Sequence, residues 1–227
     1  MQSFPVLFVG MLLGIKHAFD TDHILAVSTM ILKHKSPYKA ALIGTFWGIG
    51  HTTTLFITGL IVLILKIHIP ETVNLLLEFC VGLMLVFLGI KTLFSREIIH
   101  MHQHFHHDIE HIHYHDHGKK PNNHQHHKSF LIGAVHGLAG SGALTILVLS
   151  TIRNIFEGIY YILLFGLGSV IGMTLVSTIL GLPLLYSQKK LPKAEIYLKY
   201  FTGFLSIAFG LYLVYEIGFV KGLLVKL

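Results

Sequence analysis

Long apolar runs alternate with short polar segments along the whole chain. Six runs reach roughly 20 residues or more: 4–30, 40–66, 73–95, 129–151, 157–184 and 196–219. About 20 apolar residues in a helix cross the hydrocarbon core of a bilayer. No water satisfies backbone groups there, and continuous apolar runs favour helices over alternating barrel strands. The pattern predicts an all-α polytopic membrane protein with six transmembrane helices, whose ends are marked by Pro70, Pro183 and Pro192.

The longest polar stretch divides the chain into three parts. Residues 96–128 hold twelve of the eighteen histidines. We interpret 1–95 as a first three-helix repeat, 96–128 as a histidine-rich loop and 129–227 as a second three-helix repeat. Only 12% of the residues are charged, against about 25% in soluble domains, which excludes a separate soluble domain. The lone cysteine, Cys80, excludes an internal disulfide and a CxxC redox pair.

The two halves share short motifs at a nearly constant offset. Three pairs match: Gly14-Ile-Lys-His17 with Gly133-Ala-Val-His136 at an offset of 119, Gly48-Ile-Gly-His51 with Gly166-Leu-Gly-Ser169 at 118, and Gly82 and Gly89 with Gly203 and Gly210 at 121. An odd number of helices per repeat makes the second copy enter the membrane from the opposite face. The sequence therefore predicts a 3+3 inverted-topology repeat, which is typical of secondary transporters with a site near the midplane.

The basic residues predict how the chain lies in the membrane. The loops after the first, third and fifth spans carry twelve lysines and arginines, and the opposite side carries four. By the positive-inside rule, the histidine-rich loop is cytoplasmic and both termini lie outside a multi-pass plasma-membrane protein. The net charge of +6 comes from these short loops, so we interpret it as a topology signal and predict the lipid bilayer, and no nucleic acid, as partner.

Four ionisable residues interrupt the first apolar run: His17, Asp20, Asp22 and His23. One carboxylate near the bilayer centre costs roughly 2.5–3.5 kcal/mol on insertion scales, so such a cluster indicates function. Imidazole and carboxylate are ligands for first-row divalent metals. The cluster predicts a metal site in the membrane, with a buried ion-pair network as the alternative.

The helical period constrains which of these residues share an ion. His17, Asp20 and His23 fall within an arc of about 120° on a regular helix, and Asp22 lies about 100° further round. Either Asp22 orients an imidazole from outside the ligand set, or the helix is locally unwound, as transporter helices often are. We also hypothesise that Lys16 neutralises a carboxylate when no ion is bound.

Two further histidines lie inside apolar runs. His51 follows Gly48 and Gly50, and it either joins the first-helix cluster or makes one interhelical hydrogen bond. His136 occupies the place in the second repeat that His17 occupies in the first, so we predict that it is a ligand or lines the pathway.

The polar loop is a second candidate for metal binding. Its candidate ligands alternate with other residues or adjoin one another: His102, His104, His106, His107, His111, His113, His115 and His117. Imidazoles in such a segment bind Zn²⁺, Ni²⁺, Co²⁺ or Cu²⁺ with little selectivity. We predict a metal buffer or sensor at the cytoplasmic mouth, with a pH-responsive disordered linker as the alternative. Neither a GxxxxGK[ST] loop nor an HExxH motif occurs, and we predict no enzyme activity.

Several motifs resemble a known family. The segment from His17 to His23 resembles the His-x4-Asp-His signature of the nickel/cobalt transporter family, and Phe46 to Thr52 resembles its second motif. Residues 135–144 and 165–173 are similar to the compact six-span urease-accessory (UreH-type) branch. The resemblance implies movement of Ni²⁺ or Co²⁺, with His17, Asp22 and His23 as the signature positions. The long histidine loop, in turn, resembles nickel/cobalt efflux proteins of the same superfamily.

Together these features predict a transmembrane transporter of Ni²⁺ or Co²⁺ working in the direction of uptake. The ion is the substrate, and we expect no tightly bound cofactor. A nickel enzyme such as urease, or a metallochaperone, is the expected downstream partner. The alternatives are efflux of the same ions and a membrane metal sensor that does not transport. The ligand types do not separate Ni²⁺ from Co²⁺ or Zn²⁺.

Overall fold

The computed structural model describes residues 3–32, 34, 36–67, 69–95, 102–106, 109–113, 124–151, 154–190 and 192–226. The helices run α1 Ser3–His17, α2 Thr21–Ile31, α3 Pro37–Leu65, α4 Glu71–Leu93, α5 His124–Thr151, α6 Ile155–Lys190, α7 Pro192–Tyr215 and α8 Leu223–Lys226, with a π-helical turn, η1, at Glu216–Val220. Two short strands, β1 His102–His106 and β2 Ile109–His113, lie between α4 and α5. The apolar part of the described chain is thus entirely helical.

Four described helical segments are long and apolar enough to cross a membrane: Pro37–Leu65, Glu71–Leu93, Ile155–Pro183 and Ile196–Val220. They coincide with four of the predicted apolar runs. The first predicted run is divided between α1 and α2, and the fourth corresponds to α5. The chain is therefore a multi-pass membrane protein.

Proline acts differently at the different helix ends. Pro37 and Pro192 are the first residues of α3 and α7, and Pro70 immediately precedes α4. The prediction that Pro183 marks a helix end is wrong, because Pro183 lies inside α6, which continues to Lys190. Proline removes one backbone hydrogen bond and kinks a helix without always ending it. The leucine, glutamine and lysine residues that follow are good helix formers, so the helix resumes.

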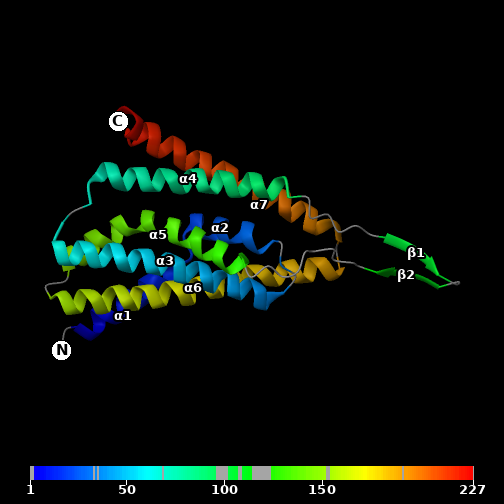
Figure 1. The fold of residues 1–227 in the computed structure, drawn as a ribbon, viewed down its shortest axis with the longest axis horizontal. Helices are drawn as coiled ribbons and strands as arrows, with labels where there is room; N and C mark the ends of the chain where they lie inside the picture. The colour runs from blue at the N-terminus through cyan, green and yellow to red at the C-terminus, as the bar shows by residue number, and fades with distance from the viewer. Residues whose placement is uncertain are drawn as a thin grey trace.

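The histidine-rich loop is an exception to the all-α prediction. Its strands β1 and β2 pair antiparallel, with His102 opposite His113 and His104 opposite His111. Strand side chains repeat every second residue, and the His-x-His alternation of this segment has the same period. The hairpin projects from the end of the helical body that is opposite the two chain termini (Figure 1).

The helices lie side by side along the long axis of the molecule (Figure 1). Helix α3 packs against α5 and α6, α1 packs against α6, and α4 packs against α7. The short helix α2 contacts α3, α4, α6 and α7, so it joins the α4/α7 pair to the other helices.

Glycines allow the closest helix contacts. An ideal Cβ on Gly14 of α1 would lie 2.0 Å from the carbonyl oxygen of Phe165, and one on Gly133 of α5 would lie 2.0 Å from that of Trp47. A Cβ on Gly210 of α7 would approach the carbonyl oxygen of Gly82 to 2.7 Å. Only residues without a side chain permit backbones to approach this closely.

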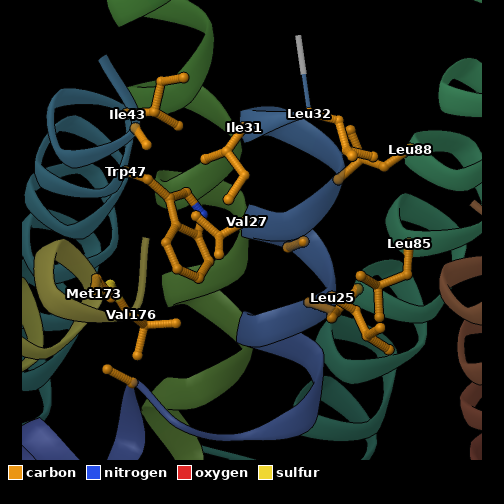
Figure 2. Packing of buried hydrophobic residues seen from close by; sticks show 14 of the residues in the cluster. Leu25, Val27, Ile31, Leu32, Ile43, Trp47, Leu85, Leu88, Met173 and Val176 are labelled. Carbon is orange, nitrogen blue, oxygen red and sulfur yellow. The ribbon is translucent and has the colours of Figure 1, made fainter. Parts of the chain in front are cut away.

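The main hydrophobic core surrounds α2. Figure 2 shows Val27 and Ile31 of this helix beside Trp47 of α3, and Leu25 on the side facing Leu85 of α4. All five side chains are buried. Because both faces of α2 are packed, the position of its first turn relative to α3 is fixed, and this turn carries Asp22 and His23.

Candidate metal centre

The first apolar run is broken where its ionisable residues lie. Helix α1 ends at His17 and α2 begins at Thr21. A tight turn joins them: the N–H of Phe19 donates to the carbonyl oxygen of Lys16 at 2.9 Å, and that of Asp20 donates to the carbonyl oxygen of His17 at 3.1 Å. The helix is therefore locally unwound here, which is one of the two alternatives that the helical period left open.

Asp22 is the hydrogen-bonding hub of the cluster. Its Oδ1 accepts from the backbone N–H of His23 and from the Nδ1 of the same residue, both at 3.0 Å. Its Oδ2 accepts from the Nε2 of His136 on α5 at 2.8 Å. The carboxylate also lies in the first turn of α2, where the helix dipole favours a negative charge. Asp22 therefore fixes the orientation of two imidazoles from different helices.

His17 and His51 form the other side of the cluster. The Nδ1 of His17 donates to Oδ2 of Asp20 at 2.8 Å, and its Nε2 lies 3.2 Å from Nε2 of His51 on α3. The ring of His23 lies 4.4 Å from the ring of His17 and 5.0 Å from that of His51, centroid to centroid. Three imidazoles from α1, α2 and α3 thus converge.

Two overlapping groups of ligand atoms lie close enough together to hold a metal ion after a small movement. One ligand atom each from His17, His23 and His51 lies within 4.8 Å of the other two, and the same holds for Asp22, His23 and His136. Donors about 2.1 Å from a common ion lie at most about 4.2 Å apart, so movements of under about 1 Å would close either group around an ion. His23 belongs to both groups.

Burial of the cluster leaves several polar atoms without a partner. His23, His51 and His136 are at most 1% exposed. Among the described residues, Nε2 of His23, Nδ1 of His51 and Nδ1 of His136 have no hydrogen-bond partner. Buried polar groups in proteins almost always have one. The unpaired Nε2 of His23, whose Nδ1 is held by Asp22, is a nitrogen donor suited to a cation.

Apolar rings form one wall of the cluster. The Trp47 ring system lies 5.2 Å from the ring of His23 and 5.6 Å from that of His136, and Phe165 of α6 lies 5.6 Å from His17. Sequence reasoning assigned Trp47 no role, although it precedes His51 by one helical turn. It also missed Ser169, which is fully buried with an unpartnered hydroxyl and which the predicted repeat pairs with His51.

The structure brings the six predicted residues together, although their metal binding stays a prediction. His17, Asp22, His23, His51 and His136 converge as described above. Asp20 differs from them because its side chain is 52% exposed and, among the described residues, bonds only to Nδ1 of His17.

Two other predictions concern neighbouring segments. Lys16 is exposed and forms no ion pair with either carboxylate in the part of the chain that the structure describes. Of the predicted loop ligands, the backbones of His102, His104, His106, His111 and His113 are described. His107, His115 and His117 lie outside the described residues.

Comparison with known proteins places the chain in a family. The family model described as the cytochrome C biogenesis protein transmembrane region matches residues 56–212. No solved structure matches the chain.

Three curated relatives differ in their similarity. The urease accessory protein UreH of Bacillus sp. (strain TB-90) is 40% identical over 96% of this chain and 94% of its own length. The proposed nickel/cobalt efflux system MJ1092 of Methanocaldococcus jannaschii is 29% identical over 72% of this chain and 70% of its own. The chloroplast protein FOR GROWTH AND FERTILITY 1 of Arabidopsis thaliana is 26% identical over 90% of this chain and 57% of its own. The chain therefore belongs to the UreH family, within the group that the cytochrome C biogenesis transmembrane-region model describes.

Proposed function

We propose that this protein carries Ni²⁺ or Co²⁺ across the membrane through the centre built around His23. The observation that carries the proposal is the convergence of four imidazoles and Asp22 at the break in the first helix. A hydrated divalent ion does not cross hydrocarbon, so a carrier must offer replacement ligands. Imidazole nitrogen and carboxylate oxygen bind first-row divalent ions, and conduction requires that the ions also leave the site.

We further propose that the six predicted spans form a 3+3 inverted repeat. The contacts of the motif glycines support this. Gly14 approaches the carbonyl of Phe165 as closely as Gly133 approaches that of Trp47. The repeat relates these two contacts, because Gly133 corresponds to Gly14 at an offset of 119 and Phe165 corresponds to Trp47 at an offset of 118. Helices α4 and α7 meet where Gly82 approaches the carbonyl of Gly210 and where Gly89 approaches that of Gly203. The repeat offset of 121, which pairs Gly82 with Gly203 and Gly89 with Gly210, relates these two contacts to each other. Rocking of one repeat against the other would then expose the centre to alternate sides.

The two ligand groups suggest how an ion passes through the centre. His17, on the side of the partly exposed Asp20, receives the ion together with His51 and His23. His23 also belongs to the group with Asp22 and His136, so a small rotation of its imidazole hands the ion from one group to the other. No step requires the ion to be without at least one protein ligand.

Uptake is the direction that we favour, with the histidine-rich loop on the cytoplasmic side and the termini outside. The bias of lysine and arginine supports this orientation, and the hairpin and the termini lie at opposite ends of the molecule (Figure 1). In this arrangement the loop histidines would receive the arriving ion for a nickel enzyme or a metallochaperone. The name of the urease accessory relative supports the uptake direction, and that of the efflux-system relative favours export.

Flux measurements on reconstituted vesicles test these proposals. We expect labelled Ni²⁺ to enter vesicles containing the full chain, and H17A to reduce entry to the level of protein-free vesicles. Deleting residues 100–127 should change the rate without abolishing it. Comparing flux into and out of vesicles of known orientation separates uptake from efflux.

The same variants distinguish a sensor from a carrier. Binding without flux in the full chain, sensitive to the loop deletion and insensitive to H17A, would contradict transport and favour a non-transporting sensor. Retention of normal nickel flux by H17A would exclude the centre as the pathway.

A further inference from the structure

Gly140 of α5 differs from Gly133 and Gly137 on the same helix. An ideal Cβ on Gly133 would lie 2.0 Å from a backbone oxygen of α3, and one on Gly137 would lie 2.3 Å from the carbonyl oxygen of His51. Those two glycines are required by helix packing. At Gly140, the nearest atom to an ideal Cβ is Nε2 of His17, at 3.5 Å, which is ordinary van der Waals contact. Packing therefore tolerates a side chain at this position.

A side chain at position 140 would contact the imidazoles of the candidate centre. The three atoms nearest to an ideal Cβ on Gly140 are Nε2 of His17 at 3.5 Å, Cε1 of His51 at 3.7 Å and Cε1 of His17 at 3.8 Å. The same Nε2 of His17 faces Nε2 of His51 at 3.2 Å, in the group that also contains the unpartnered Nε2 of His23. Glycine inside a helix is less stable than alanine. The volume that its missing side chain leaves is adjacent to the nitrogens that would bind the ion.

We propose that Gly140 is a specificity-determining residue, because it keeps free the volume that the ligand shell of Ni²⁺ needs beyond the three imidazoles. Ni²⁺ in nitrogen and oxygen sites takes tetragonal geometry, whereas Zn²⁺ closes into a four-coordinate tetrahedron. A methyl group at position 140 fills the free volume and disfavours the wider shell. This inference rests on the proposed transport function and assigns selectivity within the same centre.

A competition experiment on the full chain tests the role of Gly140. Vesicles containing the wild-type protein or G140A take up labelled Ni²⁺ while unlabelled Zn²⁺ is varied. The KM for Ni²⁺ and the Ki for Zn²⁺ are then compared. We expect G140A to raise the KM for Ni²⁺ about tenfold, within the range known for changes around metal ligands, and to leave the Ki for Zn²⁺ unchanged.

The control is G218A, a second glycine-to-alanine change, whose Cβ would meet the flexible end of Leu224 at 3.1 Å and the ring edge of Phe79 at 3.4 Å. We expect G218A to change neither constant. If G140A does not reach the membrane, G140S fills the same volume with a side chain that can bond to its own helix, and the same shift is expected.

Two results would overturn the inference: an unchanged KM for Ni²⁺, or a parallel rise of KM and Ki, which a general distortion of the centre would produce. Absence of nickel flux in the wild-type protein would instead refute the proposed function on which the inference rests.

Discussion

The segment α1–α2 and helix α5 begin from the same sequence motif and end in different structures. Both carry a glycine three positions before a histidine, Gly14 before His17 and Gly133 before His136. Both glycines pack against a carbonyl of the opposing helix, and in each case an ideal Cβ would lie 2.0 Å from the carbonyl oxygen. Beyond the histidine, however, α1 ends and α2 begins after three residues, whereas α5 continues to Thr151.

The difference shows that the residues that set the helix contacts are not the residues that would bind the ion. The glycines that set the helix contacts are alike, while the residues after each histidine differ. The first segment has two carboxylates and His23, and the second has Gly140 at a place that touches His17 and His51. One segment therefore supplies ligands and their hydrogen-bond acceptors. The other supplies one imidazole and free space.

Of the changes that test this comparison, removing the charge of Asp22 should have the largest effect on nickel flux. In D22N, an amide replaces the acceptor of three N–H groups, and its NH₂ group opposes one of those donors. We expect nickel flux to fall to the level of protein-free vesicles while the protein remains in the membrane. Flux close to that of the wild type would mean that Asp22 does not organise the centre.

The two motif glycines should be equally sensitive to substitution. G14A and G133A each place a methyl group against a backbone oxygen, and overpacking of this kind costs about 1–3 kcal/mol. We expect both variants to lower the unfolding midpoint in detergent by similar amounts, with G218A as the unaffected control. If only one of the two is destabilised, the packing of the two segments is not equivalent.

Asp20 should matter less than Asp22. Its carboxylate is half exposed and accepts from His17, so D20N weakens the orientation of one imidazole and leaves the buried network intact. We expect an approximately tenfold rise in the KM for nickel, measured as initial flux beside D22N at equal protein content. A complete loss of flux in D20N would place Asp20 among the ligands themselves.

Much of the centre could be predicted from sequence because its residues violate the surrounding pattern. His17, Asp20, Asp22 and His23 are costly in an apolar run, so their presence indicated function before any contact was known. His51 and His136 were found for the same reason. Trp47 and Gly140 could not be found in this way, because an aromatic residue or a glycine in a membrane helix is ordinary.

The sequence by itself determined the apolar helices and the ionisable residues within them. The physical reason is that each polar group left without a hydrogen-bond partner in hydrocarbon costs free energy. Only the tertiary structure decided that the first helix breaks at His17 and that Asp22 joins α2 to α5. It also decided that Gly140 faces imidazoles, whereas Gly133 and Gly137 face backbone atoms of α3. These outcomes depend on which helices meet and in what rotation, and that is settled by packing between residues more than 100 positions apart.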